Sequence, residues 1–117
     1  MKPAPLKPTV SVEELEKLDI RVGTIESVED VKESKKLVLL VVDFGDHTRN
    51  IVAGIKQERA DPHEIAGKQA LFVVNLEPRE MAGRVSEGML FDIGYPDGIV
   101  PVLALPEKPV PNGARAG

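Results

Sequence analysis

The residues whose side chains could do chemistry gather in a polar loop, residues 78–88, between two apolar segments. Within this loop, the run Gly83–Gly88 carries Ser86, but it lacks the spacing and the strand-to-helix context of a nucleophilic serine elbow. His47 and His63 do not match the spacing of a zinc motif. We therefore predict no catalytic residue, no metal site and no cofactor, in a protein that is not an enzyme.

Composition narrows the class of protein further. The chain has 117 residues, a net charge of −4 and no cysteine, which excludes disulfides and thiolate chemistry. An acidic chain without a basic tail does not coat a long run of phosphates, so any contact with nucleic acid must be local. Residues 1–10 lack an apolar core of signal-peptide length, and no apolar run reaches the ~20 residues of a membrane helix. We expect a cytoplasmic protein without membrane insertion.

One small folded domain is predicted, preceded by a short leader. The leader, residues 1–10, contains three prolines and is expected to be extended and flexible. Ser11 and Glu14 have the spacing of a capping box, so a short helix is predicted over Val12–Lys17. Residues 11–117 then form the folded domain together with a C-terminal extension.

The apolar segments after this helix predict five strands. The first begins at Ile20 and is expected to bulge or bend near Gly23, because the alternation of apolar residues loses its phase there. The remaining elements are predicted at Leu37–Val42, Thr48–Ile55, Glu58–Gly67 (a helix), Gln69–Asn75 and Gly88–Ile93. Five strands with a helix between strands 3 and 4 predict an all-β protein with an OB-fold barrel. An SH3-like barrel or a small sandwich has the same strand count but does not predict that helix as directly.

Five ordered motifs cover most of the predicted domain. They are LDIRVGTI at 18–25, VVDFG at 41–45, NIVAGI at 50–55, VVNL at 73–76 and SEGML at 86–90. Over residues 16–114 the chain resembles the tRNA-binding domain family. This family includes freestanding tRNA-binding proteins, the C-terminal domain of many methionyl-tRNA synthetases and CsaA-type secretion chaperones. The segment ESKKL at 33–37 is similar to the synthetase-like branch, whereas PEKPVPNG at 106–113 is similar to CsaA.

The resemblance implies a tRNA-binding surface on one side of the barrel. Its residues are Lys36, Asn75, Arg79, Ser86 and Met89, with Arg84 at the margin. In this interpretation the cations contact phosphates, Asn75 and Ser86 hydrogen-bond to the RNA, and Met89 makes an apolar contact. Each of these residues also has a purely structural interpretation. The cations could be solvated surface residues, Asn75 could bond to the loop backbone, Ser86 could cap a turn, and Met89 could lie in the core.

The aromatic residues indicate how RNA would be recognised. There are four, and the patterns place Phe44, Phe72 and Phe91 in or beside apolar strands, which leaves only Tyr95 free. Binding of single strands by base stacking normally uses several exposed rings. The sequence therefore favours recognition of folded RNA by shape, through phosphates and 2′-hydroxyls.

The resemblance also implies the partners. We expect tRNA and a homodimer, with much of the dimer contact in the proline-marked stretch Ile99–Val110 and additions from Val12, Leu15 and Leu18. An aminoacyl-tRNA synthetase is a further partner in this interpretation. In the alternative interpretation the protein is a CsaA-like export chaperone that binds unfolded preproteins and the export motor. A third interpretation is a structural module that recruits synthetases.

Overall fold

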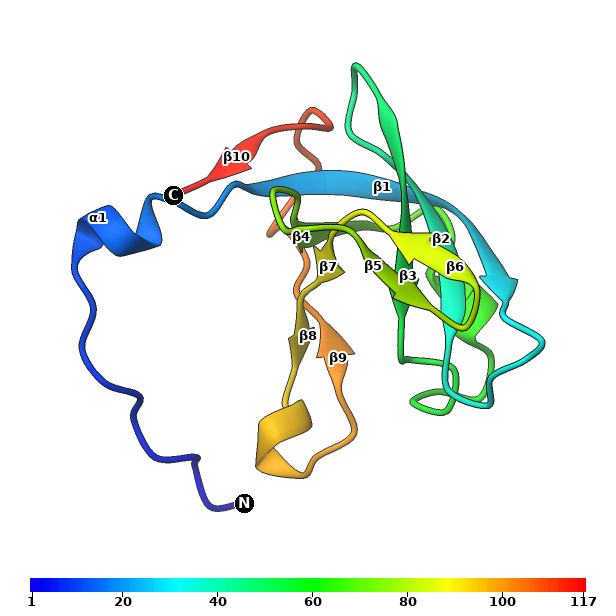
Figure 1. The fold of residues 1–117 in the computed structure, drawn as a ribbon, viewed down its shortest axis with the longest axis horizontal. Helices are drawn as coiled ribbons and strands as arrows, with labels where there is room; N and C mark the ends of the chain where they lie inside the picture. The colour runs from blue at the N-terminus through cyan, green and yellow to red at the C-terminus, as the bar shows by residue number, and fades with distance from the viewer.

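The computed structural model describes residues 1–117 and is dominated by one curled antiparallel sheet (Figure 1). The strands lie in the order β3-β2-β1-β4-β7, and β10 pairs with the start of β1. Their bounds are β1 Ile20–Asp30, β2 Val38–Asp43, β3 Thr48–Ala53, β4 Gln69–Val73, β7 Met89–Leu90 and β10 Arg115–Ala116. The sheet curls into a half-barrel, which confirms the all-β prediction and agrees with an OB-like arrangement.

Two small hairpins and three short helices complete the structure. The hairpins are β5 Arg79–Met81 with β6 Arg84–Ser86, and β8 Asp92–Ile93 with β9 Val102–Leu103. The helices are α1 Val12–Leu15 and two 3₁₀ helices, η1 Pro62–Ile65 and η2 Tyr95–Asp97. The helix predicted over Glu58–Gly67 is the shorter 3₁₀ helix η1, which begins with the expected proline after its cap residue Asp61 and ends at Ile65. No helix here has the length and apolar character needed to cross a membrane.

The short helix α1 begins at the predicted cap. The backbone N–H of Glu14 donates to the Ser11 hydroxyl at 3.2 Å, whereas the Glu14 carboxylate pairs with Lys17 instead of returning to the cap. The helix ends at Leu15 and not at Lys17 as predicted. It buries no residue within the chain, so no tertiary contact extends it beyond one turn.

The predicted bulge lies at a different place in β1. The pairing of β1 with β4 runs without interruption through Gly23, opposite Ala70, and the irregularity in the pairing with β2 falls between Ile25 and Ser27. A Cβ at Gly23 would lie 2.6 Å from the Val42 side chain. The glycine is therefore needed for close packing against the neighbouring strand rather than for a bulge.

The core is formed inside the curl of the sheet. Phe44 and Phe72 are buried there and meet edge to face, with ring centroids 5.5 Å apart. This burial confirms the predicted core positions of both rings. The predicted antiparallel pairing of the second and third strands is also confirmed, with Leu40 opposite Ile51.

The β5–β6 hairpin falls in a segment predicted as a loop. Its two-residue turn consists of Ala82 and Gly83, both with positive φ, at +50° and +78°. Such a turn is typically marked by Asn-Gly or Asp-Gly, and alanine does not carry that signal. The predicted strand Gly88–Ile93 is also divided, because the chain changes partner at Phe91 and passes from β4 to β9.

Candidate nucleic-acid-binding groove

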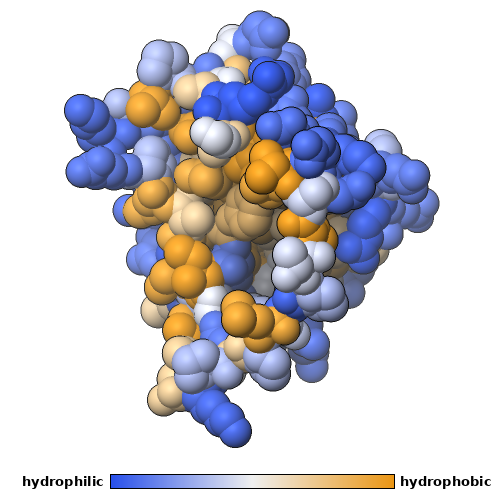
Figure 2. Space-filling view, turned by 90° about the vertical axis from the view of Figure 1, so that its left-hand side faces the viewer, coloured by the Kyte–Doolittle hydropathy of each residue, from blue (hydrophilic) through white to orange (hydrophobic).

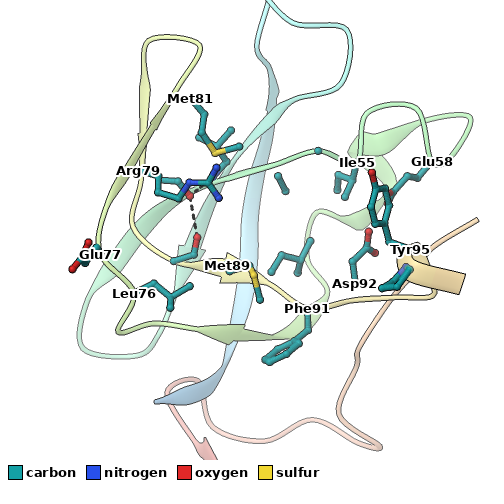
Figure 3. Close-up of a pocket in the computed structure, with 17 residues that line it drawn as sticks. Ile55, Glu58, Leu76, Glu77, Arg79, Met81, Met89, Phe91, Asp92 and Tyr95 are labelled. Atoms are coloured by element: carbon teal, nitrogen blue, oxygen red, sulfur yellow. Dashed lines mark hydrogen bonds between the residues drawn. The ribbon is translucent and has the colours of Figure 1, made fainter. Parts of the chain in front are cut away.

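A groove formed by two adjoining cavities lies beside the end of β3. The first has a volume of about 420 Å³ and the second about 580 Å³, and Gly54, Glu58 and Tyr95 line both. The β5–β6 hairpin contributes Arg79 to the first cavity (Figure 3), and the loop between β1 and β2 contributes Lys36 to the second. The groove therefore connects two of the residues that the sequence singled out.

Ser86 attaches the β5–β6 hairpin to the sheet. Its buried hydroxyl accepts a hydrogen bond from the Val52 N–H at 3.0 Å and donates one to the Gly88 carbonyl at 3.0 Å. Next to it, the backbone N–H of Glu87 donates to the Asn50 carbonyl at 2.8 Å. The Ser86 hydroxyl is thus occupied within the protein, and it positions the strand that faces the groove instead of presenting a free group to a ligand.

The loop that carries Lys36 is held by hydrogen bonds from two directions. The hydroxyl of Ser34 accepts the N–H groups of Lys36 and Leu37, at 3.1 and 3.2 Å. The ammonium of Lys56 donates to the carbonyls of Val31 and Ser34, at 2.9 and 2.7 Å. Lys56 was not predicted, because its role depends on carbonyls that lie more than twenty residues away in the chain.

The three predicted cations differ in their surroundings. Lys36 and Arg79 are exposed, line the groove and form no ion pair. Arg84 lies 3.7 Å from the Glu33 carboxylate and lines neither cavity. Two unpaired cations in one groove can therefore contact phosphates without first breaking an internal contact.

Asn75 lies outside the groove and joins two parts of the fold. Its side-chain oxygen accepts the Asp19 N–H at 2.7 Å, and its amide group donates to the Lys17 carbonyl at 2.7 Å. Asp19 in turn binds Arg21 and Arg115, which lower the pKa of its carboxyl group, the hydrogen bond from Arg21 being the largest cause. Both hydrogen-bonding groups of the Asn75 side chain are therefore used by backbone groups of the protein.

An acidic pair lies where the two cavities meet. Glu58 and Asp92 both line the first cavity, and burial raises the pKa of Glu58 to about 7, with further contributions from the hydrogen bond and the negative charge of Asp92. Arg59 opposes this shift. Glu58 is therefore partly protonated near neutral pH and can share its proton with Asp92.

Exposed apolar groups surround this pair. Tyr95 is 76% exposed, as predicted for the one free aromatic residue, and Met89 is 45% exposed and lines the first cavity. Met89 is thus not a core residue. Figure 2 shows apolar side chains gathered around a hollow on the side of the molecule where α1 lies.

A half-barrel that carries a groove with free cations and an exposed aromatic ring is typical of β-domains that bind nucleic acids. The comparison with known families agrees with this class. Residues 20–115 match the family model tRNA_bind, described as a putative tRNA binding domain. The chain belongs to this family.

The relatives in sequence include methionine–tRNA ligases. The chain is 42% identical over 109 residues to the ligase of Archaeoglobus fulgidus and 46% identical over 105 residues to that of Phocaeicola vulgatus. These matches cover 93% and 89% of this chain but only 16% and 15% of the ligases. The chain therefore corresponds to a small part of each enzyme.

Two solved structures have nearly the same extent as this chain. The MetRS-related protein from Pyrococcus horikoshii has a TM-score of 0.87 and 39% identity, and the match covers 95% of this chain and all of that one. The chaperone CsaA from Bacillus anthracis has a TM-score of 0.82 and 30% identity, and the match covers 94% of this chain and all of that one. Both branches named by the sequence resemblance are thus similar to this chain.

Proposed function

We propose that this chain is a non-catalytic tRNA-binding protein that recognises folded tRNA through the groove. The observation that carries the proposal is the presence of two unpaired cations, Lys36 and Arg79, in one groove of a chain that belongs to the tRNA_bind family. Both side chains are exposed, and both sit on segments that internal hydrogen bonds hold in place. Phosphate contacts of this kind position an RNA without reading its sequence.

Few cations in an acidic chain imply a modest affinity. About three phosphates would be contacted, by Lys36, by Arg79 and by Arg84 once it is released from Glu33. A plot of the logarithm of the binding constant against the logarithm of salt concentration should therefore have a slope of about −2 to −3. In this proposal Met89 contacts a base or ribose. In this proposal the buried Ser86 hydroxyl holds the groove strand from within, and Asn75, which lies outside the groove, does not contact the RNA.

The test is the binding of total tRNA to single variants in a salt series. Lys36→Ala and Arg79→Ala should each weaken binding about three- to tenfold and make the salt slope shallower by about 1, because each removes one phosphate contact. Their melting temperatures should stay unchanged, since neither side chain forms an internal ion pair. Lys68→Ala, which removes an exposed lysine outside the groove, is the matched control. Wild-type affinity in both groove variants would refute the assignment.

We further propose that the protein acts as a homodimer. The support is a set of exposed apolar residues that do not line the groove: Val12, Leu15, Leu18, Val102 and Leu105. Solvent-exposed apolar groups of this size commonly mark interaction surfaces. Light scattering at micromolar concentration should return twice the monomer mass of 12.7 kDa. A monomer under these conditions would remove the dimer from the proposal.

The second candidate function is that of a CsaA-like chaperone. The same exposed apolar residues favour it, because an unfolded polypeptide can bury its own apolar side chains on them. The 30% identity to the Bacillus anthracis chaperone adds support. Parallel titrations with tRNA and with a denatured client protein separate the two functions, since only RNA binding should weaken steeply as salt increases.

A further inference from the structure

We propose that Tyr95, Glu58 and Asp92 form a site for one unpaired nucleobase with an exocyclic amine, such as cytosine. The site lies where the two cavities of the groove meet. The inference rests on the proposed function, because the base would be presented by the RNA whose phosphates bind Lys36 and Arg79. It adds a specificity element to a surface that otherwise recognises only shape and charge.

Tyr95 provides a platform on which a base can stack. Its ring is 76% exposed and lines both cavities. The turn that carries it is tightly built: the N–H of Gly98 donates to the Tyr95 carbonyl, and a Cβ at Gly94 would collide with the Ile99 side chain. An exposed ring on a firmly held turn loses little entropy when a base stacks on it.

The two carboxyl groups provide the polar recognition. Figure 3 shows Glu58, Asp92 and Tyr95 together at one end of the cavity. Glu58 Oε1 and Asp92 Oδ1 are shielded from solvent and, apart from a proton that the pair can share, have no hydrogen-bond partner. The pair can share one proton between these two oxygens, whereas the second oxygen of each carboxyl group, Glu58 Oε2 and Asp92 Oδ2, is not shielded and forms no hydrogen bond. These two oxygens remain as acceptors for the N–H groups of an exocyclic amine in the cavity. Uracil fits poorly, because its carbonyl oxygens would face the carboxyl oxygens.

The rest of the first cavity offers apolar side chains that the face of a base can contact. Met89 and Phe91 line the first cavity beside Asp92, and its volume of about 420 Å³ lies within the range of small-molecule sites. Arg79 belongs to this cavity and Lys36 to the adjoining one, so the base site lies between the two phosphate contacts. A base that leaves its stack can then enter the cavity while its neighbouring phosphates stay on the two cations.

The first test measures the affinity of labelled total tRNA for Tyr95 variants. Tyr95→Ala should weaken binding about tenfold at every salt concentration with an unchanged salt slope, whereas Tyr95→Phe, which keeps the ring, should stay within about twofold of the wild type. A melting curve checks that both variants fold. If tRNA binds and Tyr95→Ala matches the wild type, the base site is refuted while the proposed function stands. If the wild type binds no tRNA, the proposed function itself fails.

The second test measures base preference with short RNA oligomers. Tyr95 is the only tyrosine and there is no tryptophan, so the intrinsic fluorescence reports on this ring alone. Oligo(C) should quench it saturably and bind about tenfold more tightly than oligo(U), which has the same ring size but a carbonyl in place of the amine. Glu58→Gln combined with Asp92→Asn should abolish this preference, and Glu26→Gln, at an exposed position outside the groove, should keep it. Equal binding of the two oligomers by the wild type would overturn the proposal.

Discussion

Replacement of Glu58 by glutamine should change how the stability of the protein depends on pH. In the folded protein burial and the neighbouring Asp92 raise the pKa of Glu58 to about 7, from an ordinary value of 4.5. Ionisation of this group is therefore harder in the folded chain than in the unfolded chain. A glutamine side chain at this position would keep the shape and could still donate a hydrogen bond to Asp92, but it cannot ionise.

Proton linkage determines whether the free energy of unfolding rises or falls with pH. Between about pH 4.5 and pH 7 the folded state holds the Glu58 proton more tightly than the unfolded state, so the free energy of unfolding falls as pH rises through this interval. A shift of the Glu58 pKa from 4.5 to about 7 would change the free energy of unfolding by about 3.4 kcal/mol if it acted in full. Because Glu58 is only part-buried and water screens the interaction, we expect about 1 to 2 kcal/mol.

The assay is urea unfolding of the wild type and of Glu58→Gln at several pH values from 4.5 to 8.5. The difference between the two free energies of unfolding isolates Glu58, since carboxyl groups with lowered pKa values, such as Asp46 and Asp61, remain in both proteins. The wild type should lose about 1 to 2 kcal/mol relative to the variant as pH rises. Glu26→Gln serves as the exposed control and should show no such trend. A difference that is constant across the range would refute the reasoning.

Two further predictions concern the hydrogen bonds of Ser86 and the close packing at Gly23. Ser86→Ala leaves the Val52 N–H and the Gly88 carbonyl without their partner, so the free energy of unfolding should fall by about 2 kcal/mol in urea denaturation; a loss below about 0.5 kcal/mol would contradict the assigned role. Gly23→Ala places a methyl group 2.6 Å from Val42 and 2.8 Å from Phe44, and the resulting overpacking should cost about 1 to 3 kcal/mol, seen as a lower melting temperature. A Gly23→Ala variant as stable as the wild type would show that β1 and β2 can move apart at little cost.

Much of the fold could be predicted from local patterns. The apolar run of β2 and the glycine-containing link to β3 indicated a hairpin, and Pro62 indicated a helix between β3 and β4. Phe44, Phe72 and Tyr95 were assigned correctly, because the two phenylalanines lie in or beside apolar strands while Tyr95 lies among turn residues. Phe91, which the pattern placed with the core residues, is only half-buried and lines the first cavity. The β5–β6 hairpin escaped prediction because the turn residue Ala82 carries no local signal for a positive φ.

The candidate site was predictable only in part. The motifs identified Lys36 and Arg79, and the structure places both in the groove. They could not distinguish these free cations from Arg84, whose partner Glu33 lies in a different loop. The role of Lys56 was missed for the same reason, since its partners are backbone carbonyls far away in the chain.

By itself, the sequence determined the all-β class, the positions of the main strands along the chain and the family resemblance, because these depend on apolar periodicity and on motifs within short segments. Only the tertiary structure decided which polar side chains are free to bind. Ser86 and Asn75 are used by backbone groups of other strands and segments, whereas Glu58 and Asp92, thirty-four positions apart, meet in one cavity. Hydrogen-bond satisfaction and burial are properties of the folded chain, so no local pattern can express them.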